Sequence, residues 1–348
     1  MADSAIPTPK LHKRRQRYRG KHPRSFSEKY KEHAPEKYPE TIRKVLGSGK
    51  TPAGTHRPVM VAEVLEVLSL QPGKIVADCT LGYGGHAQEI LSRICPGGKL
   101  VGIDADSVQL PRTEERLRGL GFSSEVFVAY RSNFAGLPQV LAREKLSGAD
   151  MIFADLGVSS MQLDDPARGF SVKLKGPLDM RTNPMRGQPA SLFLKGIKPD
   201  ALARLLVENA DEPYAELLGS ALAGRNFPTT TSLASGIRAA LARAAASDCE
   251  ITIRRVFQAL RIAVNDEFSA LEAFLRCIPM CLNPAGRVAI LTFHSGEDRR
   301  VKKAFASGMR DGSYVNISQE VIRPSVAERN GNPRSSSAKL RWAEKRGH

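Results

Sequence analysis

Short apolar runs alternate with amphipathic segments along the chain from residue 56 onward. Apolar residues at helical spacing in 62–68 and 88–94 predict two helices, and 74–78 predicts a short buried strand between them. Further apolar runs bounded by turn residues predict strands at 100–104, 125–128, 150–155 and 286–292. Because helical segments separate the strands, the pattern predicts an α/β fold with a Rossmann-like, doubly wound parallel sheet.

This alternation stops for about a hundred residues after the fourth predicted strand. Three long helices are predicted there, at 199–222, 232–246 and 252–275. We therefore expect an inserted helical domain at 166–267 that recognises the substrate, and a sheet domain formed by 56–165 and 268–348.

The chain is strongly basic, which changes the expected class of partner. Its 348 residues carry a formal net charge of +16 at pH 7, and residues 1–50 hold 14 Lys or Arg against 5 Asp or Glu. A charge of this size favours a polyanionic partner such as nucleic acid. Residues 1–55 have few aliphatic side chains, so we expect a disordered basic extension. A mitochondrial presequence is the alternative, which the acidic residues and prolines weaken.

Composition also limits the cellular location and the kinds of cysteine site that the sequence predicts. No run approaches the roughly 18 apolar residues of a membrane span, and the N-terminus lacks the apolar core of a secretory signal. We expect a cytoplasmic protein that contacts no membrane. The five cysteines are scattered without paired metal spacing, so free thiols are expected and no metal site is predicted.

A glycine motif follows the first predicted strand and points to a ligand. Gly82, Gly84 and Ala87 fit the GxGxxG/A fingerprint of nucleotide-binding loops, and Asp104 ends the next strand, 22 residues beyond Gly82. A carboxylate in that position accepts hydrogen bonds from ribose hydroxyls. These features predict an adenosine-containing ligand, and they leave both NAD and S-adenosylmethionine open.

Two further carboxylates favour the cationic ligand of this pair. Asp78 ends the first predicted strand and Asp155 ends the fourth, where the chain opens into a polar loop over 155–170. Carboxylates beside a pyrophosphate repel it, whereas they attract an ammonium group and a sulfonium. The alternative is that each carboxylate is an ordinary helix N-cap.

Several longer motifs resemble one family. They are His56-x-Pro58-Val59, Asp78-Cys79-Thr80-Leu81-Gly82-x-Gly84-Gly85-His86, Arg131-x-Asn133-Phe134, the segment 155–164, Gly176-Pro177-Leu178-Asp179-Met180-Arg181, the segment 257–267, the segment 293–299, and Asn332-Pro333-Arg334 with Leu340-Arg341. From residue 56 to the C-terminus, and in this order, the chain resembles the bacterial small-subunit ribosomal RNA cytosine-N4 methyltransferases, the MraW-like family.

This resemblance implies a methyltransferase sheet and an enzyme that uses S-adenosylmethionine. The implied reaction methylates the exocyclic N4 amine of a cytidine in the decoding region of 16S ribosomal RNA within the small subunit, which tunes P-site function, and no obligate protein partner is expected. Carried over by position, the implied cofactor contacts are Gly84, Gly85, His86, Asp104, Phe134, Asp155 and Gln162. By composition alone, Phe134 reads as core and His86 as a helix-start residue.

Two features depart from the family pattern. The basic extension before His56 is longer than usual, and Gly296 stands where the motif usually has leucine. The extension either adds phosphate contacts to ribosomal RNA or is an unstructured leader. Gly296 puts only the local packing after the fifth strand in doubt.

The predicted chemistry depends on positioning, because the lone pair of the cytosine amine is delocalised into the ring. Asp155, or a nearby backbone carbonyl, is the candidate to orient that amine. Methylation at carbon 5 is set aside, since it needs a cysteine nucleophile and none lies between Cys95 and Cys249. The sequence leaves two roles open for Asp179 and Arg181, RNA positioning or a loop-fixing ion pair. His294 either faces the base or caps a helix.

Two rival classes remain as comparisons. An NAD-dependent dehydrogenase would share the glycine loop and Asp104 but would leave the basic charge unexplained. A non-enzymatic RNA-binding or ribosome-assembly protein on the same fold would explain the charge while leaving the polar loop from Asp155 to Gln162 without a use. The oligomeric state, and the choice between naked RNA and assembled subunit as substrate, are not predicted.

Overall fold

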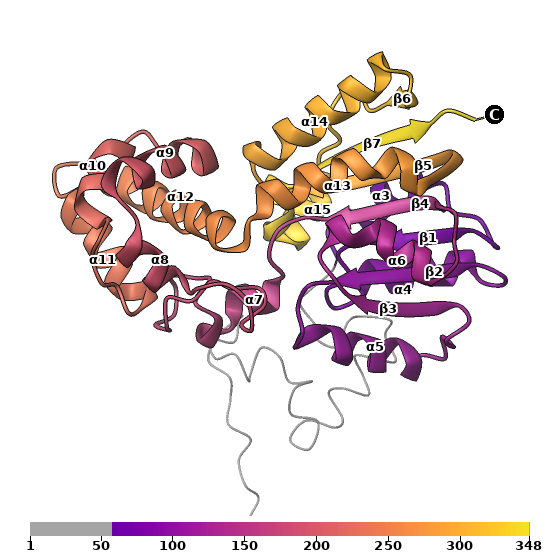
Figure 1. The fold of residues 1–348 in the computed structure, drawn as a ribbon, viewed down its shortest axis with the longest axis horizontal. Coiled ribbons are helices and arrows are strands. Elements are labelled where there is room, and N and C mark those ends of the chain that lie inside the picture. Colours follow the sequence, from indigo (N-terminus) through magenta and orange to yellow (C-terminus); the bar gives the residue numbers. More distant parts are fainter. Residues whose placement is uncertain (1–57, 348) are drawn as a thin grey trace, which may run out of the picture. The chain divides into compact units, whose positions relative to one another are not determined.

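The computed structural model describes residues 58–347, so the predicted basic extension and His56 lie outside the described residues (Figure 1). Within this range seven strands form one sheet in the order β3-β2-β1-β4-β5-β7-β6. The strands are β1 Ile75–Asp78, β2 Lys99–Asp104, β3 Phe127–Arg131, β4 Ala149–Asp155, β5 Leu282–Thr292, β6 Tyr314–Ile317 and β7 Lys339–Lys345. The first five strands are parallel, which confirms the predicted doubly wound sheet.

Helices cover both faces of this sheet because successive strand residues point to opposite sides. Val76 and the helices α3 Val61–Leu68, α4 Gly85–Ile94 and α5 Gln109–Gly119 share one apolar core. Ala77, the next residue of β1, belongs to a second core with α6 Leu137–Arg143, α13 Glu267–Cys281 and α14 Ser295–Arg310. The central strands are therefore buried on both faces, as parallel strands usually are.

Five helices follow β4 and surround an apolar core of their own. They are α8 Ala190–Gly196, α9 Pro199–Ala210, α10 Ala215–Leu222, α11 Thr230–Ala240 and α12 Ala246–Asn265. Leu206, Leu233 and Phe257 are among the buried side chains of this third core. Figure 1 shows these helices grouped to one side of the sheet. In the sequence they lie between β4 and α13. The domain boundaries expected from the sequence stay a prediction.

Several predicted element bounds are wrong for local backbone reasons. The predicted helix 199–222 is two helices, because Asp211 takes a left-handed conformation with φ of 49° and Pro213 lacks the N–H that a continuing helix needs. The predicted helix 252–275 is likewise interrupted, since Asp266 has φ of 50° between α12 and α13. Apolar spacing continues on both sides of each break, which is why periodicity alone did not reveal them.

Other bounds shift by a few residues, and some elements have no predicted counterpart. The predicted helix 232–246 ends earlier, at Ala240 of α11, and the predicted strand 125–128 is displaced to β3. β7 runs antiparallel between β5 and β6, so the far edge of the sheet is not parallel. Within the described range no helix is long and apolar enough to cross a membrane.

Candidate active site

Three carboxylates predicted from the sequence lie at one edge of the sheet. Asp78, Asp104 and Asp155 are the last residues of β1, β2 and β4, which run parallel and are neighbours in the sheet. The strand order reverses between β1 and β4, and ligands of open α/β sheets bind in the crevice outside such a switch point. The structure thus brings these three predicted site residues together.

Asp78 is buried and Asp155 is half-buried, and neither carboxyl has a cationic partner within residues 58–347. Burial raises the pKa of Asp78 to about 7, although a hydrogen bond from the Thr80 backbone N–H opposes this shift. Burial likewise raises the pKa of Asp155 to about 8, and the charges of Asp78 and Glu297 add to it. Within residues 58–347 no lysine or arginine forms an ion pair with either group. A cationic ligand would supply the missing charge.

The turn after β2 holds Asp104 in a defined orientation. Its Oδ2 accepts a hydrogen bond from the Gly82 N–H at 2.6 Å, and its Oδ1 accepts one from the Asp106 N–H at 2.7 Å. Burial raises the pKa of Asp104 against these hydrogen bonds. Each carboxylate oxygen has a second lone pair, so both remain able to accept hydrogen bonds from a diol such as ribose.

The glycines of the loop before α4 are required by packing within the protein. Gly84 has φ of 77°, and a Cβ there would lie 2.9 Å from the Cγ2 of Thr113 on α5. A Cβ on Gly85 would overlap the ring of Pro58. The glycine pattern therefore has a structural cause in addition to the ligand approach that the sequence suggested.

Side chains of α5 fix the carbonyl groups of the same loop. Thr113 donates a hydrogen bond to the Gly82 carbonyl at 2.6 Å, and Arg116 donates to the Tyr83 carbonyl at 2.7 Å. These hydrogen bonds fix the carbonyls toward α5, and so they fix the conformation of the loop that precedes α4. Free N–H groups at such a terminus bind polar or anionic ligand groups.

His86 is buried and neutral. Its Nε2 lies 2.9 Å from the Val59 carbonyl, which only accepts hydrogen bonds, so Nε2 carries the proton and Nδ1 presents a lone pair. Burial lowers the pKa of His86 to about 4. Nδ1 lies 3.7 Å from the Oδ2 of Asp155. Because the histidine is neutral and the pKa of Asp155 is raised, this contact is not an ion pair near pH 7.

Phe134 and Gln162 each have a partner inside the protein. Phe134 begins a short 3-10 helix after β3, and its ring centroid lies 5.3 Å from that of Phe274 on α13. Gln162 belongs to the capping box of α7 Ser160–Asp164, where its Oε1 accepts from the Ser159 N–H at 2.8 Å. Its Nε2 donates to Asp106 at 2.7 Å. The Gln162 amide thus connects the start of α7 to the turn after β2.

Asp106 and Arg168 are residues that the sequence analysis missed. Asp106 is 3% exposed and accepts a hydrogen bond from the Arg168 Nη1 at 3.0 Å. Burial would raise the pKa of Asp106, but the charge of Arg168 and the hydrogen bond from Gln162 outweigh it and lower the pKa. The available signal was the second carboxylate two residues after Asp104, at the end of a predicted strand.

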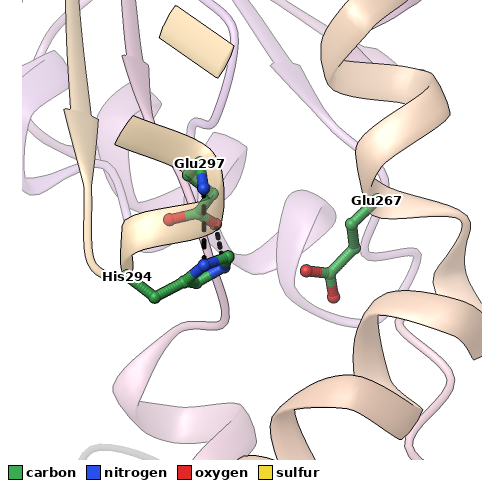
Figure 2. A group of neighbouring side chains, drawn as sticks. All are labelled: Glu267, His294 and Glu297. Atoms are coloured by element: carbon green, nitrogen blue, oxygen red, sulfur yellow. Dashed lines mark hydrogen bonds and ion pairs between the residues drawn. The ribbon is translucent and has the colours of Figure 1, made fainter. Parts of the chain in front are cut away.

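A second group of polar side chains lies where α13 and α14 begin. Figure 2 shows His294 directly beside Glu297, with Glu267 facing both from α13. The Nδ1 of His294 accepts from the Glu297 N–H at 3.4 Å, so His294 caps α14, and its Nε2 lies 3.1 Å from the Oε1 of Glu297. The capping role, one of the two predicted for His294, is confirmed.

These three residues resemble a metal site, but their contacts favour an ion-pair group. Ligand atoms of Glu267, His294 and Glu297 lie within 4.8 Å of one another. Arg261 already donates to both oxygens of Glu267, at 2.9 Å each. The Nδ1 of His294 is already the acceptor for the Glu297 N–H, and its Nε2 faces the Oε1 of Glu297 at 3.1 Å. Burial would raise the pKa of Glu297, but the hydrogen bond from His294 and the charge of Arg261 outweigh it.

Asp179 and Arg181 form the loop-fixing ion pair that was one of their two predicted roles. The Arg181 guanidinium donates to both oxygens of Asp179 at 2.8 Å. Burial would raise the pKa of Asp179, and the hydrogen bonds from Arg181 lower it. The Asp179 carbonyl also accepts from the Ala190 N–H at 2.8 Å, which connects this loop to the start of α8.

Comparison with known proteins identifies what the chain is similar to. Residues 53–346 match the model of the MraW methylase family. The chain is 47% identical to "Ribosomal RNA small subunit methyltransferase H 1" of Lachnoclostridium phytofermentans, covering 96% of this chain and 93% of that protein. It is 48% identical to "Ribosomal RNA small subunit methyltransferase H 2" of Alkaliphilus metalliredigens, covering 95% and 97%. Among solved structures, TrmN from Thermus thermophilus has a TM-score of 0.40 and 14% identity over 88% of this chain and 52% of that chain.

Proposed function

This chain belongs to the MraW methylase family, and on that premise we propose that it methylates the exocyclic N4 amine of one cytidine in the decoding region of 16S ribosomal RNA. The protein is a methyltransferase that uses S-adenosylmethionine, and its substrate is ribosomal RNA of the small subunit. Such a modification would tune P-site function, and the expected location is the cytoplasm, where the subunit is assembled. The observation that carries the proposal is the set of carboxyls with raised pKa values at the strand ends, in a chain whose residues 53–346 match this family.

The residues at the strand ends fit the cofactor. S-adenosylmethionine, when bound, supplies an electrophilic methyl group on a sulfonium. Asp104 would accept hydrogen bonds from the two ribose hydroxyls, and Asp78 would face the ammonium group of the methionine part. Gly84, Gly85 and His86 would line the pocket at the start of α4, and the exposed part of Phe134 would pack against the adenine.

The role of Asp155 in this proposal is to orient the target amine. An oxygen of its carboxyl group would accept a hydrogen bond from one N–H of the exocyclic nitrogen, directing the nitrogen lone pair at the methyl carbon. The amine would lose one proton when it takes the methyl group, and with Asp155 holding the other N–H this proton would pass to water. The negative charge of Glu297 near Asp155 would favour the positive charge that develops on the nitrogen.

The helical segment between β4 and α13 is the candidate RNA-binding part. Its basic side chains would follow the RNA backbone, and they include Arg204, Arg225, Arg238, Arg243, Arg254 and Arg255. Arg238 is paired with Glu250 at 2.7 Å on the surface. The net charge of +16 supports binding to a polyanion in general, and no membrane contact is proposed.

The deciding experiment transfers a labelled methyl group from S-adenosylmethionine to small subunits that lack the modification. Nucleoside analysis of the RNA should then find N4-methylcytidine, and Asp104→Ala should abolish its formation at the same cofactor concentration. Asp311→Ala, which changes an exposed carboxylate beyond the end of α14, serves as the control. Label on another atom would contradict the proposed target. Subunits bound without label would contradict the proposed reaction and favour an assembly role.

A further inference from the structure

Arg168 bridges two parts of the molecule that are far apart in the sequence. It ends the 3-10 helix Pro166–Arg168, between α7 and the start of α8. Its Nη1 donates to the Oδ2 of Asp106 at 3.0 Å, and its Nη2 donates to the carbonyls of Arg181 at 3.3 Å and Thr182 at 2.8 Å. The side chain is only 16% exposed. A guanidinium makes these contacts on two sides at once, which the single ammonium of a lysine cannot reproduce.

On one side of this bridge lies the turn that orients Asp104. Asp106 accepts hydrogen bonds from the N–H groups of Val108 at 2.9 Å and Gln109 at 3.1 Å. Its own N–H donates to the Oδ1 of Asp104. The ion pair with Arg168 therefore fixes the turn that presents Asp104 to the proposed ribose.

On the other side lies the junction between the helical segment and the sheet. The N–H and the hydroxyl of Thr182 donate to the Oδ1 of Asn265 at 2.8 and 2.9 Å. The Nδ2 of Asn265 donates to the Met180 carbonyl at 2.8 Å. Asn265 ends α12 just before the left-handed Asp266, so it sits where the chain leaves the helical segment for α13.

These hydrogen bonds form one continuous network, and each member is held on both sides. It runs from Asp104 through Asp106 and Arg168 to Thr182 and Asn265. Asp106 is buried and the other members are half-buried, and hydrogen bonds to charged groups in such surroundings are strong and directional. A change in the turn at Asp104 must therefore alter the contacts at the end of α12, or break the Arg168 bridge.

We propose that Arg168 is a positioning residue that couples cofactor binding at Asp104 to RNA binding by the helical segment. The inference rests on the proposed function. Cofactor in the pocket holds the Asp104 turn, the turn holds Arg168, and Arg168 holds the loop 180–182 and the end of α12. Coupling between two ligands is reciprocal, so bound RNA tightens cofactor binding by the same factor.

The test measures this coupling at equilibrium, without catalysis. The dissociation constant of S-adenosylhomocysteine, which cannot transfer a methyl group, is measured alone and in the presence of saturating unmodified small subunits. In the unaltered protein we expect about tenfold tighter binding with subunits, within the usual range of coupling factors. In Arg168→Lys the ratio should fall below twofold, while binding to the free protein changes by less than threefold.

Two further variants keep the result interpretable. Asn265→Ala cuts the network at its far end, away from the pocket, and should also remove the coupling while leaving binding to the free protein unchanged. If Arg168→Lys fails to fold, Asn265→Ala alone tests whether the coupling depends on this network. Glu216→Gln is the matched control, because Glu216 lies on α10 of the helical segment and its side chain is exposed. It should keep the tenfold ratio.

The outcomes separate this inference from the proposed function. The inference would be overturned if both Arg168→Lys and Asn265→Ala kept the tenfold effect of subunits on S-adenosylhomocysteine binding. It would also be overturned if subunits left this dissociation constant unchanged in the unaltered protein. Methyl transfer to N4 of cytidine by that same protein would then still support the proposed function. Coupling that depends on Arg168, together with label on another atom, would overturn the proposed reaction and retain the inference.

Discussion

Two groups of buried carboxylates in this protein differ in what balances their charge. Asp78, Asp104 and Asp155 at the strand ends have raised pKa values, and burial is the main cause in each. Beside α13 and α14, Arg261 donates to both oxygens of Glu267, and the pKa of Glu297 is lowered by His294 and Arg261. Arg261 and His294 satisfy the second group within the protein. In the first group, Asp78 and Asp155 have no cationic partner within residues 58–347, and Asp104 keeps lone pairs that hydroxyl donors can occupy.

This difference separates residues that bind from residues that hold the fold. A buried carboxylate without a partner is costly in free energy, so its retention at a strand end indicates a ligand that supplies the charge. A buried carboxylate with a guanidinium partner is explained without any ligand. Substitutions in the first group should therefore change cofactor affinity, and substitutions in the second should change stability.

The largest expected effect is on stability, from Glu267→Ala. It removes both hydrogen-bond acceptors of the Arg261 guanidinium and leaves a buried charge unpaired. Breaking a buried ion pair in this way should lower the free energy of unfolding by about 3 kcal/mol. Chemical denaturation measures the loss, and cofactor affinity of the free protein should stay within twofold. A large loss of cofactor affinity with unchanged stability would contradict the separation of cofactor-binding from fold-stabilising carboxylates.

The next effect is on affinity, from Asp104→Ala. Two hydrogen bonds to a charged acceptor are worth about 3 kcal/mol together, so the dissociation constant of S-adenosylmethionine should rise about 100-fold. Isothermal titration calorimetry gives this value directly. Stability should fall less than in Glu267→Ala, because the carboxylate of Asp104 is itself costly to bury. Asp104→Asn keeps one acceptor and should lie between.

A smaller effect is expected from pH. Asp78 and Asp155 keep their protons up to about pH 7 and 8, because their pKa values are raised, while the unfolded chain releases them near pH 3.8. The free protein should therefore lose stability as pH rises from about 4 to about 8. A cationic ligand favours the deprotonated forms, so affinity for S-adenosylmethionine should increase about tenfold from pH 6 to 7.5.

Calorimetry in two buffers of different ionisation enthalpy would count the protons released on binding. Asp155→Asn should flatten the pH profile. Methylthioadenosine, which carries neither the ammonium group nor the sulfonium, is the matched ligand, and its affinity should not change over this range. A profile that is the same for both ligands would show that these carboxyls do not face the charged part of the cofactor.

The smallest expected effect is on stability, from a side chain added at Gly296 beside His294. A Cβ on Gly296 would lie 2.7 Å from the Cζ of Phe268 and 3.2 Å from the Nδ1 of His294. Gly296→Ala should therefore lower the free energy of unfolding by about 1 kcal/mol through overpacking, seen as a small drop in melting temperature. Ser307→Ala, at an exposed position of the same helix, provides a comparison without added volume in the core. An unchanged melting temperature would mean that Phe268 moves aside freely.

The sequence predicted the parallel half of the fold because its signals are local. Strands such as β1 and β2 are apolar runs that end in a carboxylate, and each is bounded by turn residues. It did not predict β7, whose partners β5 and β6 lie antiparallel to it at the sheet edge. It also joined α12 to α13, since a left-handed conformation at Asp266 leaves the apolar spacing unchanged.

The candidate site was predicted where chemistry is carried by residues next to a strand end. Asp78, Asp104 and Asp155 are adjacent to strands in the sequence, so their convergence follows from a parallel sheet. Asp106 and Arg168 were missed because they are 62 residues apart, and only the tertiary structure brings them together. The assignment of individual residues to the cofactor stays a prediction.

The contact between Pro58 and Gly85 has a consequence for how this motif varies among related sequences. The glycine is required because the proline ring occupies the space of its Cβ. Replacement of Gly85 by alanine should then be tolerated in a sequence that has a small residue at position 58. Statistical covariation between positions 58 and 85 would record a steric partnership across 27 residues, and a motif search that treats this glycine as a mark of nucleotide binding would overlook such sequences.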